Sequence, residues 1–391
     1  MEPRPILPTL MILLTISLIS MVFGCPGPKE ELLPIIDIFN AHQDRTEVPI
    51  SQFGSEIEYV LLETNKDCQL GDAARYYLDK EVIVAVDFRK ILLFSRKDGE
   101  FIKQVGHWGK DPHGYAATIF SNEYDYQKKT VYTMAWKLFS FVEYSIMSEK
   151  EFTINCPSDV ASFTRLADNN FLGYIKNYSG NASYRLTEFS IYDTSSIHKI
   201  TNYNFFPNTG SVALFAMQGW FYNFSEETYF YELFTDTIFR YDHGKLLGHF
   251  KIELDKLGQR YELQSDRQFL KNRNNFIMLS SIYETQNNIF IDFAYNLTWH
   301  FYCLYDKNIQ KTWVTKSDKQ IIPGYTNDLD GFVNFPLSNI SPDGYAIGAI
   351  QAVNVMNWMD STKHTPPASI LNMKELNMSS NPLIMIVKLK K

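Results

Sequence analysis

Two short segments hold the residue types best suited to chemistry. In the first, His107 and His113 flank Trp108, and Tyr115 follows two residues later. Exposed aromatic rings stack on sugar rings and on other flat apolar ligands, and loops commonly carry binding residues. Trp108, His113 and Tyr115 are therefore candidate ligand-binding residues. A protein metal site normally needs three or four ligands, so two loop histidines favour a solvated pair over a metal centre.

The second segment is Asn327-Asp328-Leu329-Asp330-Gly331. Its alternating oxygen side chains resemble those of a calcium loop, but the EF-hand spacing and its distal Glu are absent. A turn in which Asn and Asp bond to their own backbone is the simpler explanation. Asp328 and Asp330 are kept as candidate ligand-binding residues. No cofactor and no metal are expected, with Ca²⁺ as the alternative.

Catalytic signatures are missing from the sequence. It contains no G-x-S-x-G, no H-E-x-x-H, no P-loop and no dinucleotide fingerprint. Cys68, Cys156 and Cys303 are widely spaced and form no C-x-x-C pair, which favours small buried residues on strands.

The N-terminus has the pattern of a targeting segment. Arg4 precedes an apolar stretch from Leu10 to Phe23, and Gly24-Cys25 follows. Residues 1–24 therefore predict a signal peptide, and a small residue before Cys25 is typical of a lipobox that makes this thiol the lipidated residue. An ordinary secretory signal or an uncleaved anchor is the alternative. Residues 25–50 are predicted to form a lipidated tether and lead-in.

Composition sets the class of protein. The 391 residues are 45% hydrophobic and 15% aromatic, which predicts a folded core and favours β-structure. Lys and Arg number 37 against 44 Asp and Glu, a net charge of −7 without a basic run outside the last few residues. Nucleic acid is therefore not an expected partner.

The elements that must position the candidate residues follow a repeat. An aromatic residue ends a hydrophobic run before a polar turn at Phe94, Tyr144, Tyr192, Tyr241 and Tyr305, with spacings of 50, 48, 49 and 64 residues. Such periods lie at the upper end of propeller-blade lengths. The first period predicts four strands: Arg75–Leu78, Glu81–Val86, Lys90–Ser95 and Glu100–Val105. Each unit is thus interpreted as a four-stranded antiparallel meander.

The last period is incomplete. Strands are predicted at Gly331–Phe335, Tyr345–Val353 and Pro382–Leu389, and the fourth is missing. Ile57–Leu62, ahead of the first blade, is predicted to supply it and so to close the ring. The fold class is therefore all-β, a six-bladed propeller over residues 51–391. An insertion at 354–381 is expected to form one or two helical turns, with a disordered loop as the alternative.

Several segments together resemble those of the six-bladed β-propeller lipoproteins of Bacteroidetes: residues 57–64, 101–106 with 109–115, 235–240, 327–331 and 381–387. The resemblance implies the propeller fold and a place in the cell envelope, and it implies no chemistry. Asp111 and His113 stand where that family tends to have more glycine and an acidic residue before the Tyr. Lys29-Glu30-Glu31 resembles the acidic signal that sends such lipoproteins to the outer face of the outer membrane.

Two functions stay open. The favoured one is a non-catalytic binding module of the cell envelope that holds a glycan, a peptide or another envelope protein on one propeller face. The alternative is a hydrolase or lyase working from the central channel, with Asp328 and Asp330 as acid and base. The expected location is the outer membrane, through the lipid anchor at Cys25, either surface-exposed or facing the periplasm. The protein is expected to be a monomer.

Overall fold

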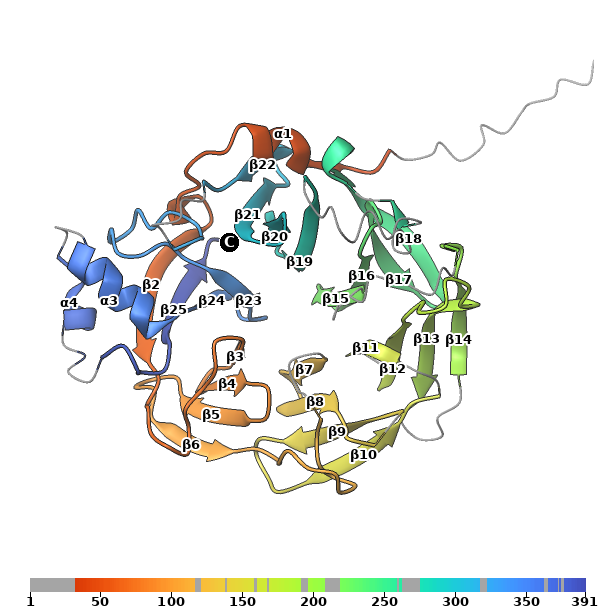
Figure 1. Ribbon diagram of the computed structural model, residues 1–391, viewed down its shortest axis with the longest axis horizontal. Coiled ribbons are helices and arrows are strands. Elements are labelled where there is room, and N and C mark those ends of the chain that lie inside the picture. The colour runs from red at the N-terminus through yellow and green to blue at the C-terminus, as the bar shows by residue number, and fades with distance from the viewer. Residues whose placement is uncertain are drawn as a thin grey trace, which may run out of the picture. The chain divides into compact units, whose positions relative to one another are not determined.

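Six sheets lie in the part of the chain that the structure describes, five of four strands and one of five, and they surround a common centre (Figure 1). The structure is a computed structural model that describes residues 32–116, 121–137, 139–157, 160–166, 169–190, 196–207, 219–258, 260–261, 275–316, 322–361, 365–371, 373 and 376–391. Pro34–Lys391 forms one compact unit, and all the sheets belong to it. The predicted fold class, a six-bladed β-propeller, is confirmed.

The blades follow one another along the chain. Blade 1 comprises β3 (Arg75–Leu78), β4 (Val82–Val86), β5 (Ile91–Ser95) and β6 (Phe101–Gln104); blade 2 comprises β7 (Asn122–Asp125), β8 (Thr130–Met134), β9 (Ser140–Ser145) and β10 (Glu151–Asn155). Blade 3 comprises β11 (Val160–Arg165), β12 (Asn170–Ile175), β13 (Tyr184–Ser190) and β14 (Ser196–Thr201). Blade 4 comprises β15 (Gly219–Phe224), β16 (Glu227–Glu232), β17 (Thr237–Asp242) and β18 (Lys245–Glu253), with β1 (Ile35–Asp37) added in parallel to β18. Blade 5 comprises β19 (Ile277–Glu284), β20 (Asn288–Tyr295), β21 (Trp299–Asp306) and β22 (Lys311–Val314); blade 6 comprises β23 (Leu337–Ile340), β24 (Tyr345–Ile350), β25 (Leu383–Leu389) and β2 (Gly54–Leu61).

The N-terminal strand closes the ring as predicted. Strand β2 pairs antiparallel with β25, with Ile57 opposite Val387. Beyond β2, the Glu63 amide donates to the carbonyl of Gly99 at 2.9 Å, in the turn between β5 and β6. Gly99 has φ +77° and lies so close to Leu61 that a Cβ would stand 2.0 Å from its carbonyl oxygen. Only glycine therefore allows this turn to pack against the closing strand.

The repeated aromatic residues mark equivalent positions in the blades. Four of them occupy the penultimate position in the third strand of their blade: Phe94, Tyr144, Tyr241 and Tyr305. The rings of Phe94, Tyr144 and Tyr305 are at most 2% exposed and contribute to the hydrophobic clusters between blades. Tyr192 lies outside the described residues. The periodic aromatic content thus fills the space between neighbouring sheets, which a propeller needs for stability.

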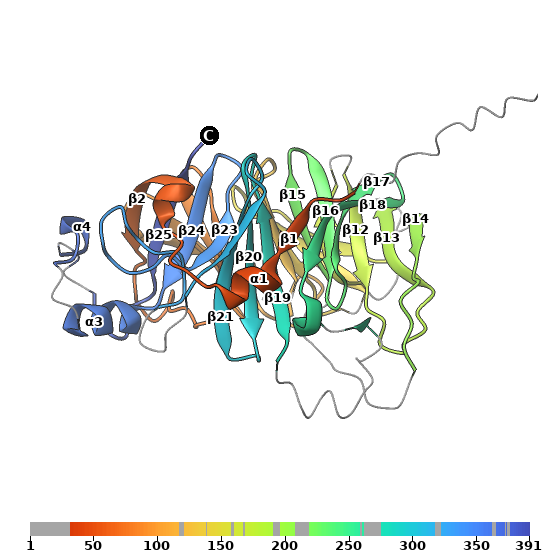
Figure 2. The ribbon, with the colours of Figure 1, turned by 90° about the horizontal axis from the view of Figure 1, so that it is seen from above.

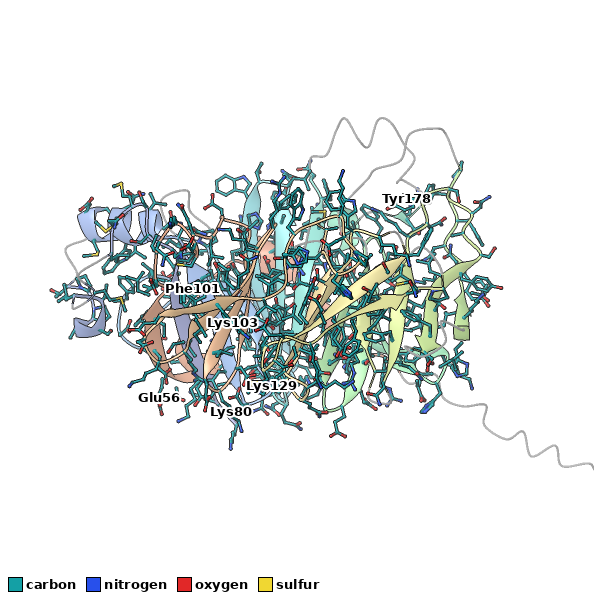
Figure 3. The ribbon with its side chains drawn as sticks, turned by 90° about the horizontal axis from the view of Figure 1, so that it is seen from below. Glu56, Lys80, Phe101, Lys103, Lys129 and Tyr178 are labelled. Carbon is teal, nitrogen blue, oxygen red and sulfur yellow. The ribbon has the colours of Figure 1, made fainter. Side chains whose placement is uncertain are left out.

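Ion pairs join blades at one face of the ring, the face formed by the turns between the first and second strands of each blade. Asp79 accepts from Lys129, which ties blade 1 to blade 2, and Asp125 pairs with Arg165 at 2.6 Å, which ties blade 2 to blade 3. Lys129 lies at this face and Tyr178, in the turn after β12, at the opposite one (Figure 3). We call the face of Lys129 the hairpin face and the face of Tyr178 the loop face.

Blade 6 differs from the prediction in its first strand. The expected strand Gly331–Phe335 is wrong, since the innermost strand is β23 at Leu337–Ile340. The apolar residues Phe332, Val333 and Phe335 are buried in a loop that packs on the closing blade, so burial rather than pairing explains their hydrophobicity.

Helices lie outside the sheets. Helix α1 (Ile38–Gln43) packs near β22, while α3 (Ala352–Ser361) and α4 (Ala368–Leu371) lie between β24 and β25 in the chain and beyond β2 in space (Figure 2). Val355 and Ile370 are buried in the cluster shared with blade 6. Two short 3₁₀ turns, Ile50–Gln52 and Asp255–Leu257, complete the assigned elements of the described chain. Within the described residues, no helix is both long and apolar enough to span a bilayer.

Candidate ligand site in the central channel

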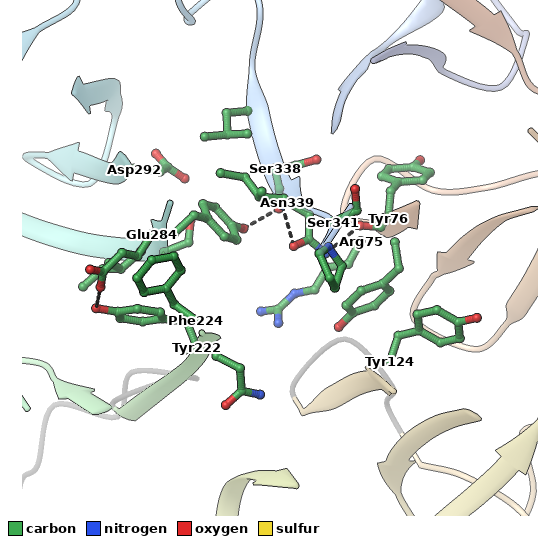
Figure 4. A pocket seen from close by; sticks show the side chains of 18 of the residues that line it. Arg75, Tyr76, Tyr124, Tyr222, Phe224, Glu284, Asp292, Ser338, Asn339 and Ser341 are labelled. Atoms are coloured by element: carbon green, nitrogen blue, oxygen red, sulfur yellow. Dashed lines mark hydrogen bonds between the residues drawn. The ribbon is translucent and has the colours of Figure 1, made fainter. Parts of the chain in front are cut away.

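The innermost strands of the six blades enclose a cavity of about 1250 Å³. Each contributes side chains to its wall: Tyr77 from β3, Asn122 from β7, Thr164 from β11, Tyr222 from β15, Tyr283 from β19 and Asn339 from β23. Tyrosine, asparagine and threonine side chains therefore surround one space, a combination of aromatic and polar groups typical of small-molecule sites. Figure 4 shows part of this lining from close by.

Much of the wall is fixed by hydrogen bonds between blades. The Tyr77 hydroxyl donates to Asn122 Oδ1 at 2.6 Å, and the Asn339 amide donates to the carbonyl of Tyr76 at 3.0 Å. The Tyr222 hydroxyl donates to Glu284 Oε2 at 2.8 Å, as Figure 4 shows. These bonds hold the side chains in place before any ligand enters, which lowers the entropic cost of binding.

Arg75, the first residue of β3, is the exception. Its side chain is exposed and reaches toward the middle of the channel (Figure 4). No hydrogen bond or ion pair joins its guanidinium to another residue of the described chain. The other arginine on an innermost strand, Arg165, is paired with Asp125. Arg75 therefore presents a charged group that is available to a ligand.

Glu284 is ionised and accepts hydrogen bonds from three neighbouring side chains. Its carboxylate receives hydrogen bonds from Lys307 at 2.5 Å, from His249 at 3.0 Å and from Tyr222. Burial tends to raise its pKa, but the hydrogen bonds and charges of His249 and Lys307 outweigh burial and lower it. This carboxylate contributes to the joint between blades 4 and 5 and has little capacity left for a ligand.

Glu123, on β7, is a second carboxyl of the channel wall. It accepts from the Thr164 hydroxyl at 3.0 Å and from the Arg165 amide at 2.9 Å. Burial raises the pKa of Glu123 to about 8, although these two hydrogen bonds act in the opposite direction. Glu123 is therefore mostly protonated at neutral pH.

Asp292, on β20, lies in a recess of the same cavity beside Ser281 and Tyr302. Its Oδ1 atom is buried and has no hydrogen-bond partner in the described chain. Burial raises the pKa of Asp292 to about 7, and a hydrogen bond with Ser281 acts against that rise. The carboxyl is thus close to half-protonated at neutral pH.

The loop residues predicted from sequence lie elsewhere, on the connection from β6 to β7. Trp108 is 40% exposed, packs edge-on against Trp136 at 5.4 Å and lies under the Arg89 guanidinium at 4.3 Å. His113 is half-exposed, with its Nδ1 3.9 Å from Glu151. Tyr115 is fully buried and donates to the carbonyl of Arg89, so its ring is not accessible to a ligand in this structure.

Asp328 and Asp330 likewise lie outside the channel lining. Asp328 accepts from the amide of Ser51 at 3.0 Å, and Asp330 accepts from the Tyr59 hydroxyl at 2.9 Å and from Asn327 at 2.6 Å. These bonds connect the loop to β2 and to the lead-in before it. The structure thus does not bring the two carboxylates into the central channel, where the enzymatic alternative needed them. Asp330 lines a second pocket of about 790 Å³ instead.

Metal ligands do not gather in the part of the chain that the structure describes, where no group of three or more His, Cys, Asp or Glu side chains suits an ion. Cys68, Cys156 and Cys303 are buried, but only Cys303 lies on a strand. Cys25 and the signal segment, residues 1–24, lie outside the described residues.

The family model for a domain of unknown function, DUF4934, matches residues 33–388. The chain belongs to the DUF4934 family. The match spans all six blades and the closing strand, so the channel is part of the family's domain. No curated protein matches this DUF4934 chain at a significant level.

Solved structures similar to this DUF4934 protein include a Bacteroides fragilis protein described as exported. The two are 16% identical, with a TM-score of 0.71 over 92% of this chain and 100% of that chain, which supports a shared fold. The extracellular domain of a protein described as a hybrid two-component system of B. thetaiotaomicron is 10% identical, with a TM-score of 0.39 over 75% of this chain and 32% of that chain. A Bacteroides caccae protein of unknown function is 7% identical, with a TM-score of 0.39 over 63% and 84% of the two chains.

Proposed function

We propose that this protein is a non-catalytic binding protein of the cell envelope that takes a small glycan or peptide into its central channel. The observation that carries the proposal is the channel itself, a cavity of about 1250 Å³ with a pre-arranged aromatic and amide wall. Its volume exceeds that of most drug-sized pockets and suits a ligand of a few sugar or amino-acid residues.

The channel carboxyls favour binding over catalysis. A hydrolase that works with two carboxyl groups needs one protonated acid and one ionised base. Burial raises the pKa of both Glu123 and Asp292, but Glu123 lies on β7 of blade 2 and Asp292 on β20 of blade 5, on opposite sides of the ring, so the two do not form such a pair. Glu284 is ionised, but Lys307 and His249 already occupy it.

The envelope location rests on the N-terminus and on one neighbour. Residues 1–24 have the pattern of a signal peptide, and Cys25 follows a small residue as in a lipobox. The neighbour that shares the fold is described as exported. We propose that a lipid on Cys25 anchors the protein at the outer membrane, either at the cell surface or facing the periplasm.

Glycan and peptide arrays probed with the mature chain test this function. Ser280→Trp places a large side chain on the channel wall at β19, and Lys103→Trp places the same residue on the exposed outer strand β6 as a control. We expect the first to abolish binding and the second to leave it unchanged. Binding that survives Ser280→Trp in a normally folded variant contradicts the proposed site.

A further inference from the structure

We infer that the ligand of the central channel carries a carboxylate, which pairs with the Arg75 guanidinium. This inference rests on the proposed function, since it names the chemistry of the ligand that the channel takes.

Arg75 lies in an unusual place for an unpaired charge. It stands on an innermost strand, faces the channel and has no hydrogen-bond or ion-pair partner among the described residues. Arginines elsewhere in the ring are used in the fold: Arg165 pairs with Asp125, and Arg185 pairs with Glu232 at 2.6 Å. A guanidinium presents a planar fork of donors that matches a carboxylate in two parallel hydrogen bonds.

The acidic groups of the inner strands do not neutralise Arg75. Glu284 is held by Lys307 and His249, and burial keeps Glu123 largely protonated at neutral pH. Asp125, at the end of β7, is paired with Arg165. Three other carboxyls line the cavity, Asp72, Asp292 and Asp343, and none of them forms an ion pair with Arg75 in the described chain. The Arg75 guanidinium therefore stands in the channel without an ion-pair partner, and such a charge favours an anionic group.

Two tyrosines place rings near this charge. Burial raises the pKa of Tyr77 and raises that of Tyr283 to about 12, and in both cases the Arg75 guanidinium opposes the rise, which puts it within electrostatic reach of both phenols. The Tyr283 hydroxyl donates to the carbonyl of Ser338, and that of Tyr77 donates to Asn122. Since both hydroxyl groups already donate to acceptors in the protein, these side chains offer the ligand ring surface rather than a further hydrogen-bond donor. The uncharged part of a ligand can therefore pack on these rings while its anionic group pairs with Arg75.

A carboxylate on a ligand of this size has two natural sources, a uronic acid sugar or the free C-terminus of a short peptide. Isothermal titration calorimetry of the mature chain separates them. The probes are tri-galacturonate with its neutral methyl ester, and the tripeptide Ala-Tyr-Ala with its C-terminal amide. The variants are Arg75→Gln, Arg75→Lys, and Arg89→Gln as the control, because Arg89 lies beside Trp108 and outside the channel.

At least one acid is expected to bind, and its neutral derivative to bind at least tenfold more weakly. Arg75→Gln should weaken binding of that acid at least tenfold, Arg75→Lys should restore part of the loss, and Arg89→Gln should change nothing. Since Arg75 is exposed, all variants should keep the wild-type melting temperature. Equal affinity for acid and neutral derivative, no effect of Arg75→Gln, or no binding of either acid overturns the inference. The proposed function fails separately, when Ser280→Trp leaves ligand binding intact.

Discussion

Ile57, in the closing strand β2, pairs with Val387 in β25, the last strand of the chain. This pairing makes the first and last parts of the ring one sheet, with Val60 and Leu62 buried in the cluster between blades 6 and 1. The closing strand leaves β25 paired on both sides, with β24 and with β2, so the last strand of the chain is not an exposed edge. The stability of the channel wall therefore depends on residues that precede the first complete blade.

Removal of the closing strand tests this dependence. Deleting residues 1–66 should lower the melting temperature by roughly 10 °C or more, since it uncovers several buried side chains worth about 1.5–3 kcal/mol each. Deleting residues 1–46 removes β1 and α1 but keeps β2, and so serves as the matched control. Equal melting temperatures for the two deletions, measured by calorimetry, would show that β2 does not stabilise the ring.

The joint between blades 1 and 2 depends on Lys129. Asp79 is 6% exposed and accepts from Lys129 and Tyr124. Burial tends to raise the pKa of Asp79, but these hydrogen bonds outweigh burial and lower it. Lys129→Met should therefore leave a buried charge and reduce the free energy of unfolding by about 3 kcal/mol. The neighbouring exposed residue gives the control Lys128→Met, and equal urea midpoints for the two variants contradict the account.

His42 should make the protein sensitive to acid. Burial lowers the pKa of His42 to about 4, and Arg45 adds to the effect; the ring packs against Phe301 at 5.0 Å and Phe293 at 6.0 Å. The unfolded chain takes up this proton near pH 6.5 and the folded chain only near pH 4, so stability should fall as the pH drops through that window, by up to about 3 kcal/mol. His42→Phe should flatten the dependence, whereas the exposed His243→Ala should not. Identical pH profiles for wild type and His42→Phe would refute this role.

Asp292 should instead make the protein less stable as the pH rises. Its carboxyl ionises near pH 3.8 in the unfolded chain and near pH 7 in the folded one. Stability from this group is therefore greatest below pH 3.8 and is lost as the pH rises to 7. Asp292→Asn should raise the free energy of unfolding at pH 8 by up to about 4 kcal/mol and change it little at pH 4. A variant that is no more stable than wild type at pH 8 in urea titrations contradicts this assignment.

Lipidation is tested independently of the fold. Cys25→Ala should move the protein from the detergent phase to the aqueous phase of a Triton X-114 partition, because the thiol that carries the lipid is gone. Pro26→Ala, one residue later, is the control and should stay in the detergent phase. Unchanged partition of Cys25→Ala removes the lipid anchor from the account.

Most of the fold could be predicted because its signals are local. Strand alternation, turn residues such as Asp98-Gly99 and a repeated aromatic position are each set by a few neighbouring residues. The first strand of blade 6 could not be predicted, because Phe332 and Phe335 are hydrophobic for packing rather than for pairing. Sequence alone does not separate these two causes.

The channel could not be predicted for a different reason. Its wall takes a few side chains from each of six blades, so Arg75 and Tyr283 belong to one site while lying far apart in the sequence. No spacing pattern connects them. Loop residues such as Trp108 and Tyr115 stood out because aromatic residues in loops are conspicuous, yet Tyr115 is buried among the residues that support the loop.

The most direct test of the account is a crystal structure of the mature protein grown with the ligand that the arrays identify. We predict electron density for that ligand inside the central channel, with an anionic group within hydrogen-bond distance of the Arg75 guanidinium. Density over Trp108, on the loop from β6 to β7, and over Trp136, in the turn from β8 to β9, together with an empty channel, would contradict the central claim.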